Sequence, residues 1–139
     1  MKYVLDSSVG FKWFLFEADT PKARKLRDDY HRGLVELIVP DVYPLEIIHA
    51  LTRAERTGRI TPQEGSTLVV DLLQTLPILH GSLPLLPRAY ELSSRCRIGM
   101  YDCIYVALAE REQCELVTSD ARLVKNMPEF PILLLDALV

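Results

Sequence analysis

The sequence has few cysteines, no long apolar run and no excess of positive charge. Its three cysteines show neither a CxxC pair nor a zinc-type spacing, and an odd number suits buried thiols in a reducing compartment. No stretch approaches the ~20 apolar residues that a membrane-spanning helix needs. Charged residues also interrupt the apolar stretch near the N-terminus, which argues against a signal peptide. We therefore expect a cytoplasmic protein that does not enter a membrane.

The charge balance is unlike that of a general nucleic-acid binder. Lys and Arg total 16 against 19 for Asp and Glu, giving a formal net charge of −3. Proteins that bind nucleic acids tightly and without sequence preference are usually basic. The balance still permits an enzyme that meets a polyanion through a bound cation, and part of the acidic excess would then belong to the metal site.

Apolar runs of strand length alternate with helical patterns over the 139 residues, a length that suits one domain. The runs are continuous, which is typical of strands buried on both faces of a parallel sheet. We therefore predict an α/β fold with helices on both faces of the sheet. The predicted strands cover residues 3–5, 34–39, 77–80, 115–118 and 132–135.

Several helix boundaries can be predicted from local signals. Thr61-Pro62-Gln63-Glu64 is a capping box with proline just inside the helix. Asp41 is expected to cap a long helix that runs toward Gly58. Gly99 is expected to close a helix over residues 88–97, and a further helix over 101–113 is expected to bury one face.

Four acidic residues are expected at the carboxyl ends of the strands, where open α/β folds place their functional crevice. Asp6 follows the first strand and Asp120 follows the strand that ends at Thr118, whereas Glu46 and Asp102 belong to first helical turns. Clustered carboxylates repel one another unless a cation offsets the repulsion. Mg²⁺ and Mn²⁺ prefer oxygen ligands, and such ions promote phosphodiester hydrolysis.

A purely structural interpretation of each acid is equally open. Asp6 and Asp120 could be helix N-caps, the commonest role for an aspartate after a strand. Glu46 and Asp102 could complement a helix dipole, which is worth ~0.3–1 kcal/mol. The metal-site hypothesis therefore depends on the set of four, and periodicity alone does not show that the set converges.

Four segments, taken in order, resemble the motifs of the PIN-domain ribonucleases, and above all the VapC-type toxins of prokaryotic toxin–antitoxin pairs. The segments are Asp6-Ser7-Ser8, Leu45-Glu46-Ile47, residues 101–109 (YDCIYVALA) and residues 117–123 (VTSDARL). The resemblance spans nearly the whole chain, and the third and fourth segments together are specific. At His49 this sequence departs from the asparagine that many relatives carry three residues after the helix acid.

The resemblance implies a single PIN-like nuclease domain over residues 1–139. Its fold would be a three-layer sandwich with a central parallel sheet of about four to five strands and helices on both faces. It also implies an endoribonuclease that depends on Mg²⁺ (or Mn²⁺), forms a homodimer and is inhibited by a cognate antitoxin. The family's catalytic and metal-binding acids match Asp6, Glu46, Asp102 and Asp120, with supporting hydroxyls at Ser8 and Thr118.

Two other classes of α/β protein with acidic sites are excluded because residues that they require are missing from this sequence. A phosphoacceptor receiver domain would need an acidic pair at the first strand and a late lysine next to proline, and Lys125-Asn126 does not supply the latter. A haloacid-dehalogenase-type phosphatase would need Asp-x-Asp, where this chain has Ser8. The open alternative is a catalytically silent PIN-like module that binds RNA or protein. Loss of an acid would be its usual mark, and all four are present.

Overall fold

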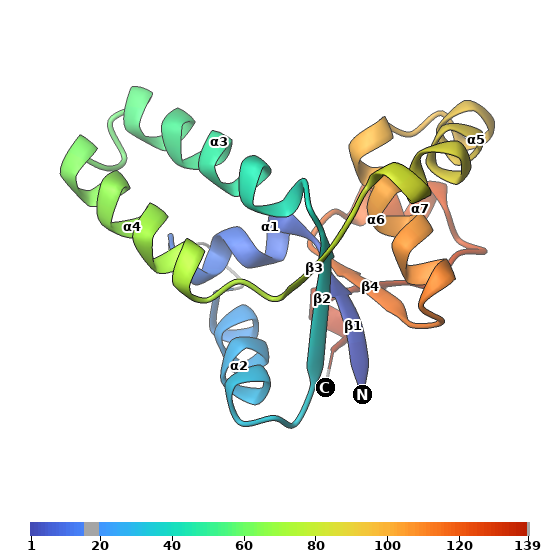
Figure 1. Ribbon diagram of the computed structural model, residues 1–139, viewed down its shortest axis with the longest axis horizontal. Coiled ribbons are helices and arrows are strands. Elements are labelled where there is room, and N and C mark those ends of the chain that lie inside the picture. The colour runs from blue at the N-terminus through green and yellow to red at the C-terminus, as the bar shows by residue number, and fades with distance from the viewer. Residues whose placement is uncertain (16–19, 139) are drawn as a thin grey trace.

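A five-stranded parallel sheet forms the centre of the protein in the computed structural model, which describes residues 1–15 and 20–138 (Figure 1). The strand order is β3-β2-β1-β4-β5, so the chain builds outward from β1 on one side and then returns to build on the other. This confirms the predicted sheet. The strands are β1 (Lys2–Leu5), β2 (Glu36–Pro40), β3 (Ile78–His80), β4 (Glu115–Thr118) and β5 (Ile132–Leu134).

The central strand β1 is buried on both faces, as its continuous apolar run predicts. Val4 lies opposite Ile38 of β2 and Leu116 of β4, and all three side chains are buried. A parallel strand with apolar side chains on both faces is stable only when helices cover both faces. Here α1 and α2 lie on one side of the sheet and α5 and α6 on the other (Figure 1).

The helices and 3₁₀ turns follow the strands in the expected alternation. The α-helices are α1 (Ser7–Gly10), α2 (Thr20–His31), α3 (Tyr43–Arg56), α4 (Pro62–Gln74), α5 (Leu86–Cys96), α6 (Met100–Arg111) and α7 (Ala121–Asn126). The 3₁₀ turns are η1 (Phe11–Trp13), η2 (Leu83–Leu85) and η3 (Leu135–Ala137).

Helix α6 is buried more completely than its sequence pattern indicates. We predicted one buried face, but every residue from Cys103 to Ala109 is buried. The reason is that α6 packs against β1, β2 and β4 while α5 covers its other side. An all-round apolar helix belongs to the core rather than to the surface, and Asp102 is thereby held at the start of a rigid element.

Helices α3 and α4 pack side by side and extend away from the sheet (Figure 1). The predicted capping box at the start of α4 is confirmed. The Thr61 hydroxyl accepts a hydrogen bond from the Glu64 backbone N–H at 3.1 Å, and the Glu64 carboxylate accepts one from the Thr61 N–H at 2.8 Å.

Two of the predicted helix boundaries are wrong. Asp41 does not cap α3, whose N-cap residue is Val42, because the Asp41 carboxylate instead accepts a hydrogen bond from the Ser82 hydroxyl. Gly99 does not close α5. That helix ends at Cys96, its C-cap residue Arg97 has the left-handed conformation with φ 61°, and Gly99 is the N-cap residue of α6. Asp41 does not cap the helix because it binds Ser82, a residue distant in sequence that spacing does not reveal.

Two bulk properties can be checked on the described residues. None of the helices within residues 1–15 and 20–138 combines the length and the apolarity needed to cross a bilayer. All three cysteines carry free thiols; Cys103 is buried, and Cys96 and Cys114 are half-buried.

Candidate active site

The carboxyl ends of β1 and β4 lie side by side at the point where the strand order reverses. The chain leaves β1 toward β2 on one side and later returns to place β4 on the other. Asp6 follows β1 directly, and its backbone N–H donates to the Val117 carbonyl of β4 at 3.0 Å. Open α/β sheets bind their ligands at such a reversal, which is where Asp6 and Asp120 lie.

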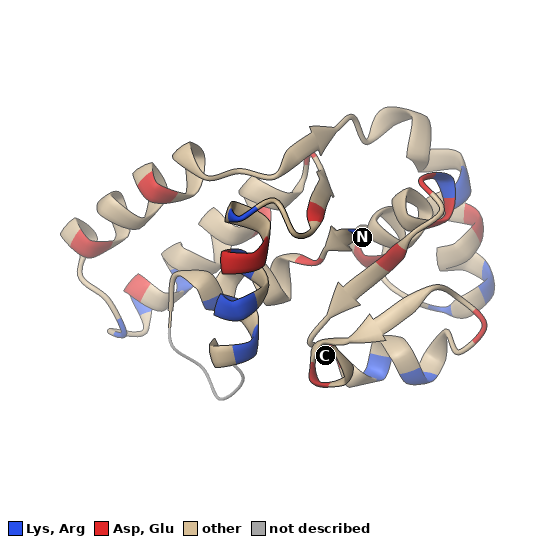
Figure 2. Cartoon of the chain, turned by 90° about the horizontal axis from the view of Figure 1, so that it is seen from below, with Lys and Arg blue, Asp and Glu red and all other residues tan. Residues whose placement is uncertain are grey.

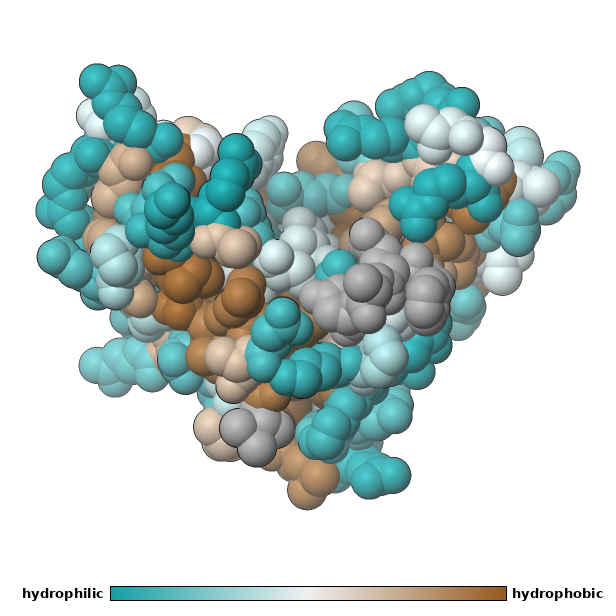
Figure 3. All heavy atoms as spheres, turned by 180° about the vertical axis from the view of Figure 1, so that it is seen from behind, coloured by the Kyte–Doolittle hydropathy of each residue, from teal (hydrophilic) through white to brown (hydrophobic). Residues whose placement is uncertain are grey.

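All four predicted acids line one cavity of about 340 Å³. Asp6 and Asp120 come from the ends of β1 and β4, Glu46 comes from α3, and Asp102 comes from α6. The surface is hollowed between the lobe that holds α3 and α4 and the lobe that holds α5 and α6 (Figure 3). Four segments distant in sequence therefore meet in one cleft, as the strand-end argument predicted.

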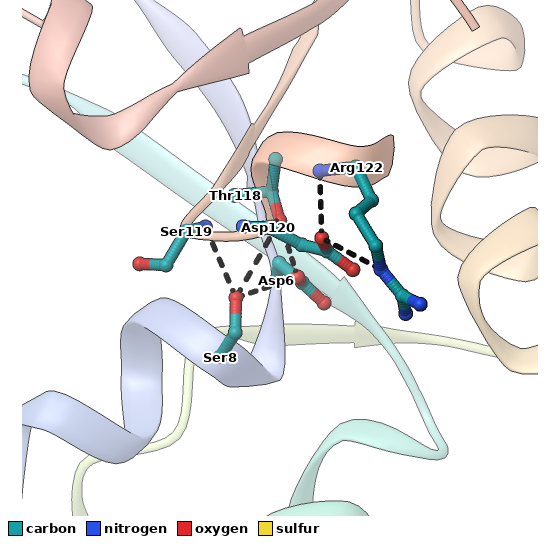
Figure 4. A network of polar contacts seen from close by, with 6 residues as sticks. All are labelled: Asp6, Ser8, Thr118, Ser119, Asp120 and Arg122. Atoms are coloured by element: carbon teal, nitrogen blue, oxygen red, sulfur yellow. Dashed lines mark hydrogen bonds and ion pairs between the residues drawn. The ribbon is translucent and has the colours of Figure 1, made fainter. Parts of the chain in front are cut away.

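Asp6 is held in place by two hydroxyls. Its side chain is 5% exposed, and its Oδ2 atom accepts hydrogen bonds at 2.7 Å from both Ser8 and Thr118 (Figure 4). Thr118 in turn accepts from the Asp120 backbone N–H at 3.1 Å, and Ser8 accepts from the Ser119 N–H at 3.1 Å. These contacts tie the end of β1, the first turn of α1 and the loop after β4 into one network.

Asp120 has the capping role that the structural interpretation allowed. It is the N-cap of α7, and its Oδ1 atom accepts from the Arg122 backbone N–H at 2.9 Å. The Arg122 side chain lies 3.9 Å from the same oxygen and is largely exposed (Figure 4). Asp6 also occupies an N-cap position, but its side chain makes no capping hydrogen bond. The helix-capping interpretation therefore explains Asp120 but not Asp6.

Glu46 has a partner that the sequence pattern did not reveal. The Tyr105 hydroxyl, on the buried helix α6, donates to Glu46 Oε1 at 2.7 Å. Tyr105 is 1% exposed, so its ring is fixed by core packing while its hydroxyl reaches the cavity wall. Tyr105 belongs to the YDCIYVALA segment, and only its position three residues after Asp102 on the same helix could have suggested this role.

The carboxyl groups disfavour one another's ionisation. Burial raises the pKa of Asp6, and the charge of Asp120 raises it further, while hydrogen bonds from Ser8 and Thr118 oppose the shift. Burial also raises the pKa of Glu46. The pKa of Asp102 rises from 3.8 to about 6 through burial and then through the charges of Asp6 and Asp120. Such mutual repulsion is what a bound cation would relieve.

The donor set fits a hard divalent cation that retains part of its water shell. The four acids supply only oxygen donors, which Mg²⁺ and Mn²⁺ prefer. Within residues 1–15 and 20–138, no three potential ligands lie close enough together to chelate one ion directly. Because Mg²⁺ usually keeps several waters and takes one or two carboxylates directly, carboxylates spread around one cavity are compatible with such an ion.

Lys12 is a further cavity residue that sequence reasoning missed. It is 7% exposed and, among the described residues that line this cavity, it is the only basic one. Its place in η1, directly after α1, brings a cation to the rim of an acidic cavity. A lysine after an apolar strand and a short helix has no distinctive spacing, so only the fold shows it.

Helix α2 carries a basic segment (Lys22, Arg24, Lys25 and Arg27) that does not line this cavity, and two of its cations lie close to carboxylates. Lys25 forms an ion pair with Asp29 at 2.8 Å, and Arg27 lies 3.8 Å from Asp28. In Figure 2 the ribbon of this helix carries both basic and acidic residues. These contacts are typical of a solvated, ion-paired helix face rather than of a stripe that binds phosphates.

Comparison with known proteins agrees with the geometry. The PIN domain matches residues 3–127 of this chain. Ribonuclease VapC12 of Mycobacterium tuberculosis is 34% identical over 125 residues, which cover 88% of this chain and 90% of that protein. Ribonuclease VapC3 of Pyrobaculum aerophilum is 27% identical over 130 residues, covering 92% and 96%.

A solved structure supports the same fold. The crystal structure of VapBC2 from Rickettsia felis, bound to a DNA fragment from their promoter, superposes with a TM-score of 0.71 at 14% sequence identity. The match covers 96% of this chain and 98% of that chain. The chain belongs to the PIN-domain family. Within that family, its sequence relatives place it with the VapC ribonucleases.

Proposed function

We propose that this chain is a metal-dependent endoribonuclease, the toxin of a VapBC-type toxin–antitoxin pair, acting in the cytoplasm as one PIN-like domain over residues 1–139. The observation that carries the proposal is the convergence of four carboxylates on one cavity at the strand-order reversal. The names of the VapC relatives supply the substrate class, which is RNA. In this proposal Asp6, Glu46, Asp102 and Asp120 hold Mg²⁺ or Mn²⁺.

The chain's own residues prepare the site for in-line attack on a phosphodiester. A bound ion would neutralise phosphate oxygens and lower the pKa of a water that acts as the nucleophile. Ser8 and Thr118 hold the Asp6 carboxylate by two hydrogen bonds, and Tyr105 holds that of Glu46. These fixed orientations reduce the reorganisation that the site would otherwise need during the reaction.

The test is cleavage of a mixed RNA pool with Mg²⁺ or Mn²⁺ against EDTA. Asp6→Asn keeps the size of the side chain but removes its charge, and we expect a loss of about 100-fold or more, since removing one stabiliser of transition-state charge costs roughly 10²–10³. Asp71→Asn is the matched control because Asp71 is exposed on α4 and does not line this cavity. We expect the control to cleave at the wild-type rate.

Two outcomes would contradict the proposal in different ways. Absence of cleavage by pure, folded wild-type protein with either metal would favour the catalytically silent binding module. Cleavage by Asp6→Asn at the wild-type rate would remove Asp6 from the proposed metal ligands while leaving nuclease activity intact. Circular dichroism of each variant distinguishes lost chemistry from lost folding.

We also propose a cognate antitoxin protein as the binding partner and a homodimer as the assembly of the free toxin. The named complex VapBC2, whose VapC-like chain this protein resembles in fold, supports a partner of the antitoxin class. Large apolar side chains are exposed on β3 and the following turn η2, namely Ile78 at 56%, Leu79 at 44% and Leu83 at 80%, and are consistent with a surface that another chain covers.

A further inference from the structure

A second cavity of about 500 Å³ adjoins the carboxylate cavity. Ser7 and Glu46 line both cavities, so the two cavities share a wall. The remaining described residues of the second cavity are Leu45 and His49 from α3 and Tyr101 from α6. We refer to this space as the Tyr101 cavity.

The Tyr101 cavity differs in chemistry from its acidic neighbour. Tyr101 is 57% exposed and Leu45 is 65% exposed, so both expose apolar surface beside Glu46. Leu45 and His49 are four residues apart on α3 and therefore lie on the same face of that helix. A flat aromatic ring, an aliphatic side chain and an imidazole with two hydrogen-bonding nitrogens thus surround one space.

We propose that the Tyr101 cavity is a nucleobase subsite, which holds the base next to the phosphate that is cut. The inference rests on the proposed nuclease function and deepens it by naming residues that select the RNA sequence. A ligand seated in both cavities must combine a phosphate at the carboxylates with a flat, partly apolar group beside it. A nucleotide within single-stranded RNA has that combination.

The individual side chains match what single-stranded RNA recognition uses. Aromatic rings of proteins stack on unpaired bases, and polar side chains then read the base edges. Tyr101 would stack on the base, Leu45 would pack against its other side, and His49 would hydrogen-bond to its edge. Because Tyr101 directly precedes Asp102 on α6, the stacked base and the carboxylate site would be held by the same rigid helix.

The test compares Tyr101→Ala with Tyr101→Phe, which keeps the ring, and with Tyr90→Ala as a control. Tyr90 is 68% exposed on α5 and lines neither cavity, so its removal reports the loss of an exposed tyrosine alone. The substrate is a short RNA that the wild type cleaves at one position. We expect Tyr101→Ala to raise KM about tenfold or more, as alanine substitution of base-stacking aromatics does, whereas Tyr101→Phe and Tyr90→Ala stay near wild type.

An abasic substitution identifies the base involved. Removing one of the two bases that flank the cut should weaken wild-type kcat/KM about as much as Tyr101→Ala does, and the two changes together should cost no more than either alone. His49→Gln should change the base preferred at that position. Additive losses from Tyr101→Ala and from every abasic position would overturn the proposal, and so would equal KM values for wild type and Tyr101→Ala.

A measurement of RNA binding distinguishes failure of the subsite proposal from failure of the nuclease proposal. Fluorescence anisotropy of a labelled, short single-stranded RNA measures binding without cleavage. In the presence of Mg²⁺ and in the Asp6→Asn background, Tyr101→Ala should weaken this binding about tenfold. If the RNA binds in this way although the wild type cleaves no RNA, the nuclease proposal fails and the Tyr101 cavity remains a site that binds an unpaired base. If Tyr101→Ala instead changes only the mass of the protein in light scattering, a second copy covers the cavity and the subsite proposal is wrong.

Discussion

At the scale of single residues, the acids of the cavity oppose the stability of the metal-free protein. Asp102 is half-buried beside Asp6 and Asp120, and burial and both charges raise its pKa to about 6. In the folded protein, a carboxyl group with a raised pKa is more stable in its protonated form than in its ionised form. The arrangement is unfavourable without a cation, and strongly perturbed carboxyl groups in a cavity are typical of functional sites.

We predict that Asp102→Asn raises the thermal stability of the metal-free protein at pH 7. An acid whose pKa is raised on folding, here from 3.8 to about 6, stabilises the folded state fully below the lower value and loses that contribution as the pH rises through the higher one. The difference in Tm between Asp102→Asn and wild type in EDTA should therefore grow between about pH 4 and pH 6. Calorimetry across that range measures it.

The same variant should respond less to metal. Mg²⁺ or Mn²⁺ that binds only the folded state stabilises the wild type by an amount that grows with the logarithm of the ion concentration divided by Kd, so Asp102→Asn, which binds the ion more weakly, should show a smaller rise in Tm. The exposed-acid variant Asp71→Asn controls for removal of a carboxylate from the surface. If the difference in Tm between Asp102→Asn and wild type in EDTA stays constant from pH 4 to pH 7, then burial and the neighbouring charges do not disfavour the ionised Asp102 carboxylate.

At the scale of secondary-structure elements, a close contact between α1 and α3 sets the position of the site. Gly10 ends α1 and lies against the ring of Tyr43 at the start of α3; a Cβ atom at Gly10 would come within 2.8 Å of Tyr43 Cε2. Tyr43 is fully buried, so its ring has little room to move. The glycine therefore lets α1, which carries Ser7 and Ser8, approach the helix that carries Glu46.

We predict that Gly10→Ala destabilises the protein by roughly 1–3 kcal/mol, the usual cost of overpacking a core, and lowers nuclease activity as well. Gly65→Ala on α4 is the matched control, because a Cβ atom there would meet Ile60 Cδ1 at an ordinary 3.6 Å. That change should instead stabilise the protein by up to ~1 kcal/mol through helix propensity. Urea unfolding of both variants tests the pair, and a stability of Gly10→Ala equal to wild type would refute the contact argument.

Elements with strong local signals were predicted well, and those with competing partners were not. The run of residues 115–118 and the capping box of Thr61 appear as predicted, since each depends on a few adjacent residues. The strand predicted from residue 34 begins at Glu36, because Gly33 has φ 75° and the chain is still turning there. Gly99 was misassigned because Arg97, a residue that rarely adopts the left-handed conformation, does so here.

At the scale of the whole molecule, the negative net charge and the ion-paired α2 indicate that affinity for RNA does not come from a basic surface. The chain carries a formal charge of −3, and α2 pairs Lys25 with Asp29. The metal proposed for the acidic cavity would resolve the apparent conflict between an anionic protein and an anionic substrate. The exposed apolar side chains point to protein partners as well.

We predict a homodimer in solution and a larger complex with the antitoxin. Light scattering should give twice the 15.8 kDa chain mass for the free protein, and a monomeric mass would refute the dimer.

Expression of the chain alone should arrest growth, and co-expression of the neighbouring antitoxin gene should restore it. Asp102→Asn should be harmless in the same assay; unaltered growth with the wild-type chain would count against a toxin.

The sequence alone predicted the fold class and, through its resemblance to the PIN-domain ribonucleases, the four candidate acids and the supporting hydroxyls of Ser8 and Thr118, because strand ends and short motifs are local features. That the four acids line one cavity could be seen only in the folded chain, since it depends on how β4 returns beside β1. The folded chain also places Lys12 among the acids, joins Tyr105 to Glu46 by a hydrogen bond and puts Tyr101 in the adjoining cavity. These positions depend on elements that meet only when the core closes around α6, so the sequence offers at most an indirect signal, such as the three-residue spacing between Asp102 and Tyr105.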